Sequence, residues 1–130
     1  MFVLSLDQAR SNQTAPWDEL IMDLGSVKVF HDRYPVTPGH RLFVPRYDSA
    51  LNIAECFQQA YKYGESMVAA GECDGFNIGM NVGASAGQTV MYPHVHCILR
   101  RTGDCVDPVG GVRAVIPSQA NYRKPAYRLP

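Results

Sequence analysis

The sequence predicts a chain that combines β-strands with helices, and three observations support this. Several short segments alternate apolar and polar residues, which is the pattern of strands with one buried face. A longer segment, residues 50–68, repeats apolar residues at spacings of three and four, as an amphipathic helix does. Two β-rich segments, Val27–Asp32 and Arg41–Pro45, flank a rigid connection with two prolines and a glycine. Strand, tight connection and strand together indicate an antiparallel pair.

The N-terminal part is predicted to contain a short helix. Phe2–Leu6 is an apolar run that suits a strand or an extended arm, and Ser11–Ala15 is polar and turn-like. Pro16 then opens Trp17–Leu24, whose first residues include two acidic side chains. Proline fits the first helical turn and carboxylates favour its positive end, so we expect a helix that Gly25 ends.

The long helix is expected to begin at an N-cap formed by Asp48 or Ser49 and to end at Gly71. Its apolar stripe is interpreted as core packing. The stripe consists of Ala50, Ile53, Ala54, Phe57, Ala60, Tyr61, Gly64, Met67 and Val68.

After the helix, Phe76–Val82 alternates again and is predicted to be a strand. The residues expected to face the core are Phe76, Ile78, Met80 and Val82.

Gly87–Arg101 (GQTVMYPHVHCILRR) is the segment with the strongest chemical signal. On a strand, side chains two residues apart share a face, so Tyr92, His94 and His96 would project together while the alternate positions are apolar. The preceding Gly83–Gly87 is small enough to bring backbone N–H groups close to an anion. The alternative is that both histidines are ordinary surface residues of a half-buried strand.

Length and composition indicate one ordinary domain without a strong electrostatic partner. The chain has 130 residues, is 46% hydrophobic, and balances 12 basic against 12 acidic side chains. Neither nucleic acid nor membrane is therefore an expected partner. The four cysteines form no Cys-x-x-Cys pair, which disfavours a zinc ribbon. With no signal peptide or long apolar run visible, a cytoplasmic protein is expected.

The sequence resembles the histidine triad (HIT) family of nucleotide hydrolases and transferases, including microbial diadenosine polyphosphate hydrolase-like members. The resemblance rests on GQTV, on the alternating histidines, and on the Arg and Gly-Asp that follow. A second matching segment, FHDRYPVTPGHRLFVPR, precedes the long helix. In this family the fold is α+β, an antiparallel sheet of about five strands with helices packed on it, here one long and one short.

The resemblance implies catalytic roles residue by residue. It places Tyr92, His94 and His96 at the three triad positions, so His94 would be the nucleophile and Tyr92 departs from the family's first histidine. One nitrogen of His94 would attack the α-phosphorus, while the other donates its proton to a fixed backbone acceptor that the sequence cannot show. Developing charge would be offset by His96, Gln88, Thr89 and the loop N–H groups.

The resemblance also implies nucleotide-binding roles. The carboxylate of Asp32 can accept from both ribose hydroxyls, although it could instead simply cap a turn. Asn81 could likewise be a turn-initiating residue and His40 a strand-end surface residue. The expected nucleotide-binding residues are Phe30, His31, Asp32, His40, Asn81 and Gly87.

The expected organisation is a single HIT-like domain over residues 1–130. Its core motif region spans about 27–116, with an N-terminal arm and short helix over 1–26 and a C-terminal tail over 117–130. The family implies a symmetric homodimer. No metal ligand cage is apparent, no cofactor is expected to be tightly bound, and any Mg²⁺ would arrive on a polyphosphate substrate.

The expected function is a nucleotide hydrolase or transferase for a purine nucleotide substrate. It would cleave at the α-phosphate of a dinucleoside polyphosphate or related conjugate through a nucleotidyl-histidine, releasing a nucleoside monophosphate. A nucleoside phosphoramidase and a non-catalytic nucleotide-binding HIT protein, the latter motivated by Tyr92, are the alternatives. A metal site built from His94, His96 and His40 is a further, weaker alternative.

Overall fold

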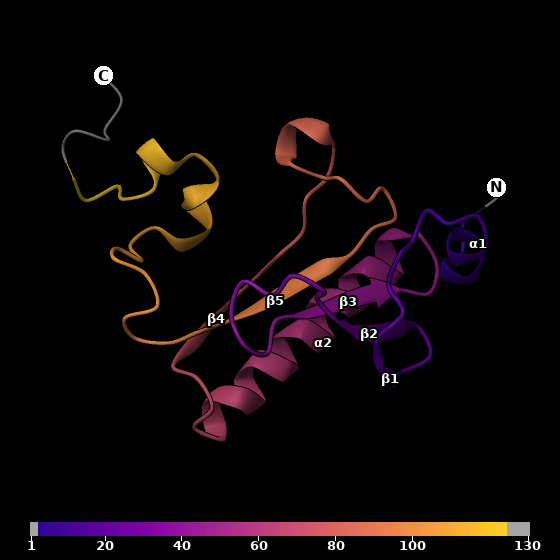
Figure 1. Cartoon of the computed structure of the whole chain (residues 1–130), viewed down its shortest axis with the longest axis horizontal. Helices are drawn as coiled ribbons and strands as arrows, with labels where there is room; N and C mark the ends of the chain where they lie inside the picture. Colours follow the sequence, from indigo (N-terminus) through magenta and orange to yellow (C-terminus); the bar gives the residue numbers. More distant parts are fainter. Residues whose placement is uncertain (1–2, 125–130) are drawn as a thin grey trace. The chain divides into compact units, whose positions relative to one another are not determined.

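The computed structural model describes residues 3–124 and places a mixed set of strands and helices along the chain (Figure 1). The chain divides into two compact units that join at the Arg100–Arg101 peptide bond. The elements are α1 (Leu6–Ser11), β1 (Leu20–Asp23), β2 (Val27–His31), β3 (Arg41–Pro45), α2 (Ala50–Ala69), β4 (Gly75–Gly79), β5 (Val95–Arg100) and three 3-10 turns, η1 (Ala84–Ala86), η2 (Gly111–Val115) and η3 (Pro117–Gln119).

The first unit is built on one five-stranded antiparallel sheet with the strand order β1-β2-β3-β5-β4. The predicted α+β fold, with a five-stranded antiparallel sheet and one long helix, is confirmed. β5 lies between β3 and β4, where His96 pairs with Leu42 on one side and Gly79 on the other. The sheet register thus holds His96 between two neighbouring strands.

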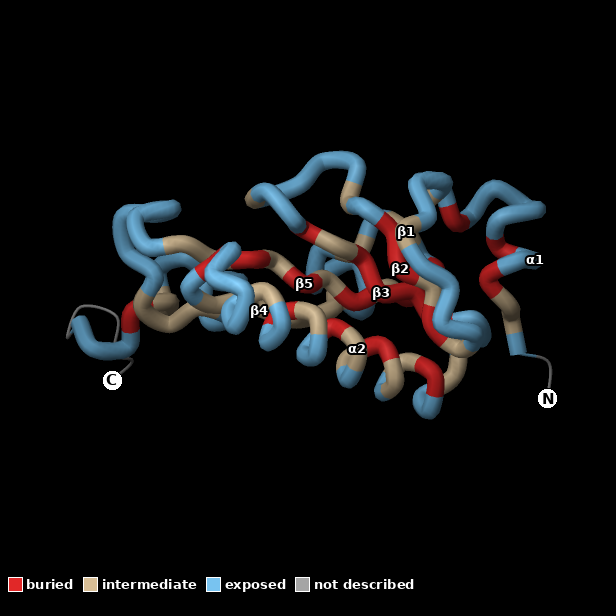
Figure 2. The backbone as a smooth tube through the Cα atoms, turned by 90° about the horizontal axis from the view of Figure 1, so that it is seen from below, coloured by how far each residue is buried: buried red, intermediate tan, exposed pale blue. Residues whose placement is uncertain are grey.

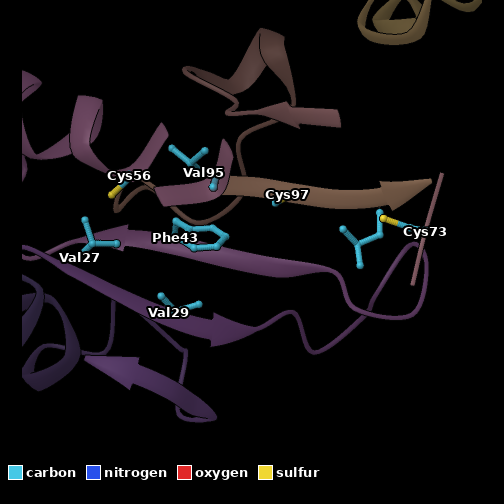
Figure 3. Packing of buried hydrophobic residues seen from close by; sticks show 9 residues of the cluster. Val27, Val29, Phe43, Cys56, Cys73, Val95 and Cys97 are labelled. Carbon is cyan, nitrogen blue, oxygen red and sulfur yellow. The ribbon is translucent and has the colours of Figure 1, made fainter. Parts of the chain in front are cut away.

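Helix α2 covers one face of the sheet, contacting β2, β3, β4 and β5. Figure 2 shows its buried residues on the side toward the strands and its exposed residues on the outer side. The core between the two layers is made of apolar side chains, most of them small or branched, and several are labelled in Figure 3. It consists of Val27, Val29, Phe43, Cys56, Ala60, Cys73, Val95, Cys97 and Leu99.

The opposite face of the sheet is covered by the N-terminal segment. Phe30, Leu42 and Val44 alternate with the residues that face α2, and therefore point to this second face. They pack against α1 and Trp17. The second cluster consists of Leu6, Ala9, Ala15, Phe30, Leu42, Val44 and Tyr92, with Leu4 and Trp17 packed against it.

The predicted helix over Trp17–Leu24 is wrong. Leu20–Asp23 forms β1, which pairs with β2 at the edge of the sheet. The short helix is instead α1, which a capping box between Ser5 and Gln8 starts. β1 and β2 form a hairpin, in which the Leu24 N–H donates to the Val27 carbonyl at 2.8 Å. Pairing in the sheet outweighs the helix signals of Pro16 and the acidic residues, which are equally local.

The long helix is close to its prediction, with Ser49 as N-cap and Gly71 following it at a φ of 76°. Its buried face differs in detail. Asn52 and Cys56, which the predicted stripe omitted, are buried with Ala60 and Gly64 at a spacing of four, whereas Tyr61 and Val68 are exposed.

The strand predicted over Phe76–Val82 is shorter than expected and ends at Gly79. Phe76, Ile78 and Met80 pack against the core as predicted. Val82 does not, because the chain has left the sheet and its side chain is 69% exposed.

The second unit holds two 3-10 turns that its own hydrogen bonds tie together. Arg113, from the Gly-Gly-Val-Arg segment, donates to the carbonyls of Gln119 and Ala120. The Asn121 amide donates to Asp107 at 2.8 Å, and this bond holds the pKa of the Asp107 carboxyl below its usual value. These contacts give Arg113 a structural role within this unit.

No helix in the described part of the chain combines the length and apolar character needed to cross a bilayer.

Gly64→Ala tests the contact between α2 and β4. Alanine normally favours a helix over glycine, but a Cβ at this position would clash with the Phe76 ring. We expect the free energy of unfolding to fall by about 1–2 kcal/mol, as overpacking outweighs the gain in helix propensity. Chemical denaturation measures it, with the exposed Gln58→Ala on the same helix as a control within about 0.5 kcal/mol of the parent. Stabilisation by Gly64→Ala would contradict the close packing.

Candidate active site

A pocket of about 280 Å³ lies on the sheet face opposite α2, within the first unit. It is formed where the N-terminal segment, the β2–β3 connection, and the segment before β5 converge. Its lining residues are Pro16, Trp17, Asp18, Asp32, Arg33, Tyr34, Leu42, Asn81, Gly87, Gln88, Thr89, Val90, His94 and His96.

His94 directly precedes β5, and a hydrogen bond to a nearby backbone carbonyl orients its ring. Its Nδ1 lies 2.9 Å from the carbonyl oxygen of Tyr92, which can only accept a hydrogen bond. Nδ1 therefore carries the proton, and Nε2 keeps its lone pair. The indole of Trp17 lies on this imidazole, with ring centroids 4.9 Å apart. Burial lowers the pKa of His94, although the hydrogen bond to the Tyr92 carbonyl opposes this, so the ring is neutral at neutral pH.

A chain of hydrogen bonds fixes the protons of His40 and His96. The backbone N–H of Val36 donates to Nδ1 of His40 at 3.0 Å, so the proton of the neutral His40 ring lies on Nε2. That Nε2 is 2.9 Å from Nδ1 of His96, which must then accept. The proton of His96 is consequently on its Nε2, a buried atom with no protein acceptor within residues 3–124. His96 thus keeps one donor unused beside the pocket.

The pKa values of these two rings are consistent with neutral imidazoles. Burial is the main cause for both. It lowers the pKa of His40, with the Asp32 charge opposing, and together with the neighbouring His94 and His40 it lowers the pKa of His96 to about 4.

Asp32 caps a turn, as one of the two sequence interpretations expected, and it also lines the pocket. One carboxylate oxygen accepts from the backbone N–H of Tyr34 at 2.7 Å and so caps the turn after β2. The other oxygen lies 3.4 Å from Nε2 of His40 and 3.8 Å from Nδ1 of His96. The side chain also lines the pocket, so the turn cap holds a carboxylate at its wall.

Tyr92 differs from its expected orientation. β5 begins only at Val95, and Tyr92 lies in the second cluster with 2% of its surface exposed. Its hydroxyl donates to the carbonyl of Pro45 at 2.6 Å, and burial raises its pKa. The phenol therefore does not share a place with the two imidazoles and does not line the pocket. The Tyr92 ring contacts the Trp17 ring, with centroids 6.4 Å apart, and Trp17 in turn contacts His94.

The glycine-rich segment acts differently from the expected phosphate cradle. N–H groups of Ala86, Gly87 and Gln88 bond to carbonyls of the same turn, and the Gln88 amide is engaged with Gly83, Val90 and Met91. Gln88 therefore braces the loop rather than offering a free donor.

The part of this loop that lines the pocket is 87–90, where Gly87 adopts a φ of 90°. Thr89 is exposed, and its hydroxyl makes no hydrogen bond to the described residues. Asn81 also lines the pocket, as expected. The groups free to bind an anion are thus at the end of the loop.

Two further expected nucleotide-binding residues lie away from the pocket. Phe30 is fully buried beneath Trp17, with ring centroids 6.2 Å apart, and His31 is exposed at the end of β2. His40 is buried and acts on the pocket through His96.

Sequence reasoning missed one wall of the pocket. Trp17 and Asp18 come from the segment wrongly predicted as helix, and Arg33 joins Asp18 in an ion pair of 3.2 Å across the pocket rim. The unusual signal that could have drawn attention to this wall is Trp17, the one tryptophan of the chain.

Asp32, His40 and His96 also bring three potential metal-ligating atoms within 4.8 Å of one another. This set contains the carboxylate that the predicted histidine-only site lacked, and it leaves out His94. The donor set suits zinc. The protonation pattern opposes it, because Nε2 of His40 carries the proton while Nδ1 accepts from Val36, so binding through Nε2 requires that hydrogen bond to break.

Comparison with known proteins identifies the class to which this fold and site belong. The HIT domain family matches residues 14–103, and the chain therefore belongs to the HIT family.

Individual relatives agree with this assignment. An uncharacterized HIT-like protein of Saccharolobus solfataricus is 38% identical over 79 residues, which is 55% of this chain and 57% of that protein. Adenylylsulfatase HINT3 of Arabidopsis thaliana is 30% identical over 82 residues, 58% of this chain and 42% of that protein. The chain thus spans only about half the length of these curated relatives.

Among solved structures, a Zn-bound histidine triad family protein from Mycobacterium smegmatis superimposes with a TM-score of 0.64. It is 27% identical, and the match covers 76% of each chain.

The contact between Trp17 and His94 predicts a spectroscopic signal. A protonated imidazole quenches indole fluorescence at contact distance, so emission should fall on acidification with a midpoint below 6.5, because burial lowers the pKa of His94. A fluorescence titration measures it. His94→Asn should abolish the transition, whereas His31→Asn, at the exposed end of β2, should retain it. A transition unchanged in His94→Asn would contradict the assigned contact.

The lowered pKa of His96 predicts acid-sensitive stability. With a folded pKa of about 4 and an ordinary value of 6.5, the unfolded chain binds more protons between these values. This contribution is complete above pH 6.5 and is lost as the pH falls toward 4. Denaturation at several pH values should show a shallower decline for His96→Gln than for the parent or His31→Gln. Equal slopes for all three would contradict the burial effect.

Proposed function

We propose that this protein is a nucleotide hydrolase or transferase that cleaves at the α-phosphate of a dinucleoside polyphosphate or related nucleotide conjugate. The observation that carries the proposal is the hydrogen bond from Nδ1 of His94 to the Tyr92 carbonyl. It leaves the lone pair on Nε2 of a neutral imidazole that lines the pocket. A neutral imidazole with its lone pair so fixed is a competent nucleophile near pH 7.

In the proposed reaction, Nε2 of His94 forms a bond to the α-phosphorus while the bond from phosphorus to the leaving-group oxygen breaks. The leaving group departs with that electron pair, and a nucleotidyl-histidine remains. The oxygen of water, or of another hydroxyl acceptor, then bonds to the phosphorus while the bond from phosphorus to Nε2 breaks and its electron pair returns to Nε2. The acceptor's proton passes to solvent, the nucleoside monophosphate or its ester is released, and neutral His94 is restored. The proton stays on Nδ1, hydrogen-bonded to the Tyr92 carbonyl, throughout, and this bond keeps Nε2 turned toward the substrate.

Two donors at the pocket wall can offset the charge that develops on the phosphoryl oxygens. The first is Nε2–H of His96, which has no protein acceptor in the described chain. The second is the hydroxyl of Thr89. Preorganised donors of this kind are typically worth about 3 kcal/mol each in the transition state. A hydrogen bond with His40 holds the His96 ring in place, and the hydrogen bond of the Gln88 amide holds the loop that carries Thr89.

Asp32 is the proposed ribose ligand, since its pocket-facing carboxylate can accept from two hydroxyls. Trp17, which packs on His94, supplies an aromatic surface beside the reacting phosphate. Any Mg²⁺ would be carried by the polyphosphate, and a homodimer remains a prediction that follows from the family.

Tyr92 gives the second candidate function, a nucleotide-binding protein without turnover. Its buried hydroxyl is committed to the Pro45 carbonyl, so the first triad position supplies no titratable imidazole. The same observation fits the catalytic proposal if this position is purely structural.

The decisive experiment measures AMP release from diadenosine tetraphosphate, adenosine phosphoramidate and adenylyl sulfate, the last because of the adenylylsulfatase relative. We expect turnover of at least one substrate, its loss to background in His94→Ala, and its retention in His31→Ala. Full turnover by His94→Ala would refute the nucleophile. Stabilisation by AMP with no turnover of any substrate would favour the non-catalytic alternative.

Two substitutions at position 92 then separate structural from chemical roles. Tyr92→Phe removes the hydroxyl but keeps the ring, so we expect a loss of about 1 kcal/mol in stability with turnover retained. Tyr92→His restores the imidazole found in the family pattern. A large rise in turnover in Tyr92→His would show that the missing imidazole limits the parent.

A further inference from the structure

A second hollow, of about 250 Å³, lies in the first unit between α2 and the edge of the sheet. It shares no lining residue with the pocket that holds His94. We call this hollow the Arg41 groove. It is lined by Met22, Leu24, Val29, Arg41, Phe43, Gln59, Lys62, Tyr63 and Ser66. Residues from β1, β2 and β3 form one wall and residues from α2 form the other.

Arg41 is the unusual residue of this groove. It points to the helix side of β3, and its guanidinium carbon lies 4.1 Å from the centroid of the Tyr63 ring. Its Nε is buried and has no hydrogen-bond acceptor in residues 3–124, and no acidic side chain there pairs with it. A partly buried guanidinium without a counter-charge is costly, because such groups are normally paired.

The other lining residues add one positive charge to the groove and no negative charge. Lys62 is a second cation on the helix wall, and no carboxylate lines the groove. Met22 and Leu24 are 46% and 41% exposed at its sheet edge, beside Val29 and Phe43. Cationic groups therefore lie next to an apolar wall.

We propose that the Arg41 groove binds a small molecule that joins one carboxylate to an apolar body, such as a short acyl or aryl acid. The carboxylate supplies the counter-charge that Arg41 lacks, and the planar guanidinium is suited to pairing with it. The apolar body packs on Met22, Leu24 and Phe43, whose exposed surface it removes from water. This site is independent of the proposed nucleotide chemistry.

The test uses octanoate on the whole isotope-labelled chain, with amide chemical shifts and a dissociation constant as readouts. Acetate has the carboxylate without the long alkyl chain, and octanol has the alkyl chain without the negative charge. We expect octanoate to bind more tightly than either, with shifts centred on Met22, Leu24 and Lys62. Binding no stronger than octanol, or shifts centred on His94, would overturn the proposal.

Variants make the assignment to Arg41 specific. Arg41→Gln should weaken octanoate binding by at least about tenfold, the usual value of a charged hydrogen bond. Arg46→Gln, an exposed arginine outside the groove, should leave it unchanged. Because Arg41→Gln could disturb the fold, Met22→Glu at the exposed edge strand offers a second route, placing a repelling carboxylate in the groove. Unchanged affinity in either groove variant, or tighter binding of octyl phosphate than octanoate, would reject the carboxylate site.

Discussion

The alternation of side chains along β5 is the constraint on which the site depends. Val95, Cys97 and Leu99 are fully buried beneath α2, and their burial contributes to the hydrophobic stabilisation of that face. Because a strand has a period of two, the same burial forces His96 onto the opposite face. The position of β5 between β3 and β4 then places His96 beside Leu42 and Gly79. A slip of one residue would put the imidazole in the core and Val95 in the pocket.

Hydrogen bonds with backbone groups, rather than charged neighbours, determine which ring nitrogen of each histidine carries the proton. The Tyr92 carbonyl fixes the proton of His94, and the Val36 N–H fixes that of His40 and, through it, that of His96. Burial keeps all three rings neutral, with Asp32 acting in the opposite direction. One ring therefore presents a lone pair and another a donor, which are the groups that the proposed displacement at phosphorus would use. The same proton positions disfavour metal binding by Asp32, His40 and His96, although these groups are close enough together.

Tyr92 and Gln88 show how residues in a recognisable motif can serve the site indirectly. Tyr92 fills the second cluster and holds its hydroxyl on Pro45, while its carbonyl, an atom every residue has, orients His94. The Gln88 amide forms its hydrogen bonds within the loop that carries Thr89. Tyrosine at position 92 is thus compatible with the proposed role of His94 as nucleophile.

The sequence alone determined the elements whose signal is local or periodic. The β-rich segments of β2 and β3, the alternation of β5, the stripe of α2 with a cap at Asp48 or Ser49, and the His94–His96 motif were all readable from the sequence. Only the tertiary structure decided that Leu20–Asp23 is an edge strand, that Trp17 packs on His94, and that Phe30 and His31 lie outside the pocket. It alone also showed the hydrogen-bond chain through His40. The contact of Trp17 with His94 and the hydrogen bond of His40 with His96 join residues far apart in the chain, and such contacts leave no periodic trace in the residues that make them. The β1–β2 hairpin is local, but its signal competes with an equally local helix signal, and only the assembled sheet decides between them.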